Sequence, residues 1–96
     1  MDLKNTINSA WENRDLLNES DVQNAVKEVV ELVDKGKLRV AEKKDNEWIV
    51  NEWVKKAVIL YFPISQMTTS KAGVLEFHDK IPLKNNYKEL GIRVVP

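Results

Sequence analysis

The chain contains few side chains that could carry out chemistry, and its single histidine, His78, is the clearest of them. Asp79 follows directly, so a carboxylate could orient the imidazole as a general base. A base of this kind needs a nucleophile, but the sequence has no cysteine and no G-x-S-x-G motif. We therefore interpret His78 as a solvated histidine at the end of a strand.

Two lysine pairs lie close in sequence to two tryptophans, a combination that could bind single-stranded nucleic acid. Both tryptophans, however, occupy apolar positions of the local pattern, which predicts that they belong to the core. Acidic neighbours neutralise the lysines, and 15 basic against 15 acidic side chains leave the chain without net charge. We therefore expect no binding to nucleic acid by this group of residues, which comprises Lys43, Lys44, Lys55, Lys56, Trp48 and Trp53.

The remaining polar residues predict no catalytic group and no metal site. Acidic residues are scattered along helix faces, and a chain without cysteine or a second histidine lacks the usual ligands of a transition metal. Gly36, Gly73 and Gly91 are too far apart to form a phosphate-binding loop. Arg93 lies between apolar neighbours, and read alone it is a surface arginine.

The elements that must position any site begin with two amphipathic helices. The first covers about Asp2 to Arg14, with Trp11 as its main apolar anchor. In the second, apolar residues recur at helical spacing from Val22 to Val33. Ser20 is its expected N-cap, and Gly36 is expected to close its C-terminus.

A third helix is expected to begin after Asn51 as its N-cap and to end at Pro63. Leu60 lies outside its main apolar stripe together with Ile59 and Phe62, so the last turn should be buried on two sides. The stripe itself is predicted to consist of Val50, Trp53, Val54, Ala57, Val58 and Tyr61.

Short strands accompany these helices. Leu38–Lys43 and Trp48–Val50 are expected to pair as a hairpin. Its tight turn contains Asp45 and Asn46, two residues that tolerate positive φ. A weaker pattern follows: a polar loop over Ser65–Gly73, a strand over Val74–His78, a helical turn from Asn85 or Asn86 to Leu90 closed by Gly91, and a strand over Ile92–Val95.

Length and composition fit one soluble domain. The 96 residues are 43% hydrophobic and 31% charged, as in ordinary globular proteins. No apolar stretch approaches the length of a membrane span, and the first ten residues lack the pattern of a signal peptide. We expect a cytoplasmic α+β domain over residues 1–96, mainly helical, with about three helices, a β-hairpin and short strands.

The stretch from Leu38 to Phe62 resembles a segment of bacterial tetrahydrodipicolinate N-succinyltransferases. The family segment reads LRVAEK-x-DG-x-W-x3-W-x-KKAVLL-x-F, and this chain has LRVAEKKDNEWIVNEWVKKAVILYF. FHDKIPLK and GIRVVP are similar to the family's FDKVPMK and GFRVVP, so the resemblance covers essentially the whole chain. Asn46 replaces the family's turn glycine, and asparagine tolerates that position because it also adopts positive φ.

The resemblance implies an enzyme of lysine and diaminopimelate biosynthesis. Such an enzyme transfers succinyl from its co-substrate succinyl-CoA to the amine of a ring-opened dicarboxylate, with no bound cofactor, no metal and no covalent enzyme intermediate. Arg93 matches the family arginine that binds substrate, and its guanidinium suits a carboxylate. The resemblance gives no other residue of this chain a role, so no catalytic residue is expected here.

Family members continue beyond the position of Pro96 into a left-handed parallel β-helix, which carries the acyl-CoA site, and they assemble as homotrimers. That β-helix is absent from this chain. The resemblance therefore implies the N-terminal domain of such an enzyme, inactive by itself. The alternative is a stand-alone protein–protein interaction module with the same fold, which would bind a partner through the apolar face around Val94 and Val95.

Overall fold

A computed structural model describes residues 2–96, and its contacts divide the chain into two compact units. The first runs through Ser65 and the second from Gln66 to Pro96. The expectation of a mainly helical α+β chain is confirmed, while the assignment of residues 1–96 to one domain stays a prediction. The first unit contains α1 (Leu3–Glu12), the 3₁₀ helix η1 (Arg14–Asn18), α2 (Ser20–Asp34), β1 (Ala41–Lys44), β2 (Glu47–Val50) and α3 (Glu52–Ile64).

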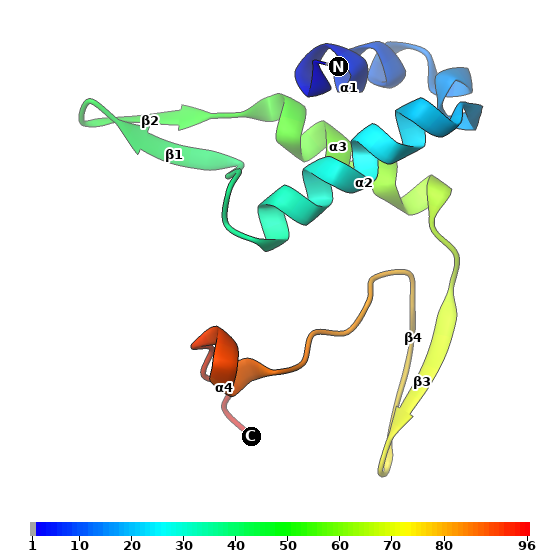
Figure 1. Ribbon diagram of the computed structural model, residues 1–96, viewed down its shortest axis with the longest axis vertical. Helices are drawn as coiled ribbons and strands as arrows, with labels where there is room; N and C mark the ends of the chain where they lie inside the picture. Colours follow the sequence, from blue (N-terminus) through cyan, green and yellow to red (C-terminus); the bar gives the residue numbers. More distant parts are fainter. Residues whose placement is uncertain (1) are drawn as a thin grey trace. The chain divides into compact units, whose positions relative to one another are not determined.

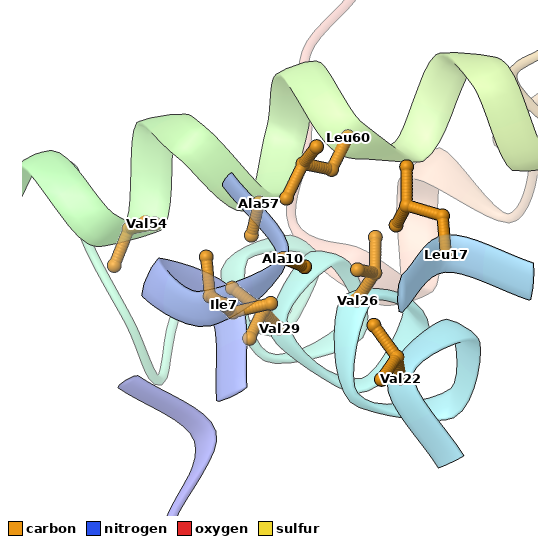
Figure 2. Packing of buried hydrophobic residues seen from close by; sticks show 9 residues of the cluster. All are labelled: Ile7, Ala10, Leu17, Val22, Val26, Val29, Val54, Ala57 and Leu60. Atoms are coloured by element: carbon orange, nitrogen blue, oxygen red, sulfur yellow. The ribbon is translucent and has the colours of Figure 1, made fainter. Parts of the chain in front are cut away.

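The core of the first unit lies where α1, α2 and α3 meet, because each of these helices contacts the other two (Figure 1). Leu60 is fully buried, which corrects its predicted place outside the apolar stripe of α3. It lies three residues after buried Ala57 and therefore continues the same helix face. The side chains shown in Figure 2 form the cluster: Ile7, Ala10, Leu17, Val22, Val26, Val29, Val54, Ala57 and Leu60.

Two residues predicted to anchor the helices in the core, Trp11 and Val50, are less buried than expected. Trp11 is only partly buried and packs on the edge of the core, whereas its neighbours Ile7 and Ala10 in α1 are fully buried. Val50 belongs to β2 and is 62% exposed, so it does not contribute to the stripe of α3. The core is therefore built mainly from small aliphatic side chains that allow the helices to approach closely.

Of the two predicted ends of α2, only the C-terminal one agrees with the structure. Ser20 is already helical, and Glu19 is the N-cap without a side-chain cap bond, so the prediction for Ser20 was wrong. Gln23 Nε2 instead donates to the carbonyl of Leu17, 2.7 Å away, because η1 leads directly into the helix. Gly36 closes the C-terminus as predicted, with φ of 74° and its N–H bonded to the Val33 carbonyl at 3.0 Å.

The hairpin of β1 and β2 projects from the helices of the first unit (Figure 1). Its predicted two-residue turn is confirmed, because Asp45 and Asn46 have φ values of 49° and 66°. Trp48 lies opposite Lys43 and is 71% exposed, which corrects its predicted place in the core. Because the hairpin extends away from the helices, its apolar side chains have no core to pack against, even where their pattern predicts burial.

Asn51 joins this hairpin to α3. It occupies the predicted N-cap position of α3 but makes no side-chain cap bond. Its Nδ2 group donates instead to the Arg39 carbonyl at 2.8 Å and to Glu42 Oε2 at 3.0 Å, and its backbone N–H donates to the Val40 carbonyl at 2.7 Å. The bond from Asn51 to the Glu42 carboxylate, with that from Lys44, holds the pKa of Glu42 below its ordinary value of 4.5.

The second unit contains a second two-stranded antiparallel hairpin and a short helix: β3 (Thr68–Ala72), β4 (Leu75–Asp79) and α4 (Tyr87–Leu90). The strand predicted at Val74–His78 is confirmed with a shift of one residue, but β3 lies in the segment predicted as a loop. Gly91 closes α4 as expected, with φ of 70°. The strand predicted at Ile92–Val95 is absent from the described residues, because no neighbouring strand is present to accept its backbone hydrogen bonds.

The burial of Leu60 and the exposure of Ile59 predict different losses of stability when each is replaced by alanine. Leu60→Ala should lower the free energy of unfolding by about 3 kcal/mol, because a buried side chain is removed and a cavity remains. Ile59→Ala, at a side chain 38% exposed, is the matched control and should cost clearly less. Urea unfolding followed by far-ultraviolet circular dichroism measures both, and equal losses would contradict the assigned helix face.

The bond between Glu42 and Asn51 predicts a pH dependence. Because the folded-state pKa of Glu42 is lowered, its stabilising contribution is present above pH 4.5 and is lost as the pH falls through the folded value. Asn51→Ala should raise the pKa of Glu42 toward 4.5, since it removes the largest cause of the shift. Carbon-13 NMR titration of the Glu42 carboxyl measures this. A midpoint in the unmutated chain at or above 4.5 would disprove the assignment.

Candidate functional site

Arg93, the one predicted substrate-binding residue, lies in an exposed segment that follows α4. The chain leaves this helix through Gly91, and the N–H of Ile92 still bonds to the Tyr87 carbonyl at 2.8 Å. Arg93 is therefore held two residues beyond a closed helix terminus. No ion pair or side-chain hydrogen bond of Arg93 occurs among residues 2–96, so all donors of its guanidinium can meet an external carboxylate.

His78 and Asp79 do not form a catalytic pair. They are consecutive residues of β4, so their side chains point to opposite faces of the hairpin. His78 Nδ1 lies 2.7 Å from Thr69 Oγ1, its partner across the strands, whereas Asp79 Oδ1 accepts from the backbone N–H of Lys80 at 2.7 Å. Both residues are exposed, which agrees with a solvated histidine on a strand.

The lysines and tryptophans considered for nucleic acid are distributed over separate elements. Lys43 lies opposite Trp48 on the hairpin of β1 and β2. Lys56 of α3 lies instead over Trp11, 5.7 Å from the ring centroid, with Nζ 3.5 Å from Asn8 Oδ1. Trp53 is partly buried against the core. The expected lack of nucleic-acid binding stays a prediction.

A contact that sequence reasoning missed surrounds Trp11. The guanidinium of Arg14 lies 4.6 Å from the ring centroid, and the Lys56 ammonium lies over the same indole. Cation–π contacts of this kind contribute about 0.5–1 kcal/mol at exposed sites. They connect η1 and α3 to α1, so the contact stabilises the helical unit and supplies no chemistry.

A shallow hollow of about 250 Å³ lies on one face of the hairpin of β3 and β4. Its walls are mainly apolar, although Thr68, Ser70 and Asp79 contribute polar atoms. No group of three or more potential metal ligands occurs within residues 2–96. The hollow is lined by Thr68, Ser70, Phe77, Asp79, Ile81, Pro82 and Leu83.

Within the described part of the chain, no helix has the length and apolar character needed to cross a membrane. The longest helix, α2, has 15 residues and places charged side chains on the face opposite the core. Its apolar stripe is accounted for by packing against α1 and α3.

Comparison with known proteins gives one consistent result. The family model of the N-terminal region of tetrahydrodipicolinate N-succinyltransferase matches residues 2–64. Proteins named 2,3,4,5-tetrahydropyridine-2,6-dicarboxylate N-succinyltransferase match the whole chain at 45% identity in Psychrobacter arcticus and 43% in Bordetella pertussis. In Alkalilimnicola ehrlichii the identity is 45% over 99% of the chain.

The chain spans 39% of the length of each of these three relatives. The matched model describes the N-terminal region of the enzyme, and it ends at residue 64, one residue before the boundary between the two structural units. The chain therefore belongs to the tetrahydrodipicolinate N-succinyltransferase family, as an N-terminal part of such a protein.

Proposed function

We propose that this chain is the N-terminal part of an enzyme that transfers succinyl from succinyl-CoA to tetrahydrodipicolinate in lysine and diaminopimelate biosynthesis. The observation that carries the proposal is the match of the whole chain to proteins named as this succinyltransferase. A cytoplasmic location and a homotrimeric assembly are parts of the same proposal. They rest on the resemblance of the sequence to that family.

In this proposal Arg93 binds a carboxylate of the dicarboxylate substrate. Its exposed guanidinium and lack of an internal partner within residues 2–96 support that role. Water adds to the ring imine of tetrahydrodipicolinate, and ring opening gives a free amine. That amine attacks the thioester carbonyl of succinyl-CoA, the new amide bond forms, and CoA leaves as the thiol with the proton lost by the amine. Arg93 orients the acceptor for this attack and exchanges no proton, because a guanidinium stays charged.

A stand-alone interaction module is the second candidate. The exposure of Val94 and Val95, at 59% and 73%, favours it, since these side chains could meet a partner protein. The gene sequence after the codon for Pro96 separates the two functions. By resemblance to the family, its left-handed β-helix is built from hexapeptide repeats. Such repeats in frame support the enzyme, and an immediate stop codon supports the module.

The 96-residue chain alone is predicted to be inactive, because none of its described residues is assigned to the binding of succinyl-CoA. The test incubates the chain with succinyl-CoA and tetrahydrodipicolinate and measures release of the CoA thiol. The full-length Psychrobacter arcticus enzyme serves as the positive control. Turnover by the chain alone near the rate of that control would refute this prediction.

Arg93→Ala in a full-length enzyme that contains this chain should lower kcat/KM about 30-fold, since a charged hydrogen bond worth about 2 kcal/mol is lost. Lys88→Ala on neighbouring α4 removes an exposed positive charge of the same region and is the matched control, expected to leave kcat/KM nearly unchanged. Steady-state kinetics at varied tetrahydrodipicolinate measures both. An unchanged kcat/KM for Arg93→Ala would remove this residue from the site.

A further inference from the structure

The second unit has secondary structure but no core. No side chain from Gln66 to Pro96 is buried, whereas the first unit contains a cluster of fully buried aliphatic residues. A two-stranded hairpin is at best marginally stable in water without a surface to pack on. The second unit therefore needs apolar contacts that residues 66–96 do not supply by themselves. Its exposed large apolar side chains are Met67, Val74, Leu75, Phe77, Ile81, Leu83, Tyr87, Leu90, Ile92, Val94 and Val95.

The two faces of the hairpin of β3 and β4 differ in chemistry. On one face, polar side chains meet in pairs across the strands. Thr69 Oγ1 lies 2.7 Å from His78 Nδ1, and Lys71 Nζ lies 3.9 Å from Glu76 Oε1. Cross-strand pairs of this kind satisfy one another in water, so this face requires no cover.

The opposite face carries Leu75 and Phe77, which are 59% and 41% exposed and lie across from Ala72 and Ser70. This face ends at the polar pair of Thr68 and Asp79. Phe77 also lines the hollow of about 250 Å³, whose rim continues through Ile81 and Leu83, at 51% and 60% exposure. Leu75 lies two residues before Phe77 on the same face of β4, outside the hollow. We call these four residues, Leu75, Phe77, Ile81 and Leu83, the apolar hairpin face. An apolar surface of this kind marks a place where another polypeptide packs.

The comparisons indicate which polypeptide this is. The family model for the N-terminal region ends at residue 64, one residue before the last residue of the first unit. Full-length relatives, by contrast, match the second unit as well, and they carry about three-fifths of their length outside the match. The second unit therefore lies between a region with its own core and a larger region that this chain does not contain.

We propose that residues 66–96 fold by docking their apolar hairpin face onto the polypeptide that makes up the remainder of the full-length enzyme. This inference rests on the proposed function. The N-terminal domain as an independently folding body then ends at Ser65. The second unit belongs structurally to the following region and brings Arg93 with it.

Hydrogen exchange tests the proposal in two proteins. One is this 96-residue chain, and the other is the Psychrobacter arcticus enzyme with its matching region replaced by this chain. Amides of residues 66–96 should exchange at least about 100-fold more slowly in the chimaera, because docking removes local opening. Amides of α1, α2 and α3 should be protected in both proteins.

Two variants of the chimaera identify the docking face. Phe77→Ser should abolish the added protection, whereas Glu76→Ser changes the adjacent residue on the opposite face and should retain it. Equal protection of residues 66–96 in the isolated chain, or protection there that rises with protein concentration, would overturn the proposal. The first outcome indicates self-sufficient folding, and the second indicates a second copy of the chain.

Activity of the same chimaera separates this inference from the proposed function. An active chimaera with unprotected residues 66–96 refutes the docking alone, and an inactive chimaera with protected residues refutes only the function. If the chimaera does not fold, the unmodified Psychrobacter arcticus enzyme and its own matching region provide the same comparison. Equal exchange in those two proteins also overturns the docking.

Discussion

The structure of the first unit depends on the burial of one apolar face shared by three helices. Valine dominates the buried side of α2, where Val22, Val26 and Val29 face the other helices. β-Branched side chains lower intrinsic helix propensity, so α2 gains its stability from packing and not from its local sequence. The hairpin of β1 and β2 depends in turn on α3, because Asn51 holds the hairpin base at the start of that helix.

Local signals in the sequence predicted local structure well. Gly36 marks the end of α2, and the pair Asp45–Asn46 forms the predicted tight turn, because positive φ is tolerated by few residue types. The errors concern the surroundings of a residue, which its own type does not reveal. Ser20 loses the cap position because η1 precedes it, and Trp48 is exposed because the hairpin leaves the core. Neither outcome can be read from the residue type alone.

The strands of the second unit also depend on more than local sequence, because a strand forms only where a partner strand is present. The segment TTSKA of β3 has no apolar alternation, so only its pairing with β4 identifies it as a strand. Ile92–Val95 has strand composition but no partner in the described chain. For the candidate site, the alternation of side chains along β4 excludes a pairing of His78 with Asp79 that adjacency in sequence suggested. The substrate-binding role of Arg93 was inferred from the family resemblance, because the neighbouring residues do not distinguish it from any other surface arginine.

The placement of the tryptophans has a practical consequence for spectroscopy. Trp11, Trp48 and Trp53 all belong to the first unit, and the second unit contains none. Intrinsic indole fluorescence therefore reports on the helical unit and its hairpin, while the ordering of Gln66 to Pro96 changes none of these fluorophores directly. An unfolding curve recorded by this signal alone would look cooperative even if the second unit had already melted. Tyr87 provides a natural site for a second probe, because it lies in α4 of the second unit.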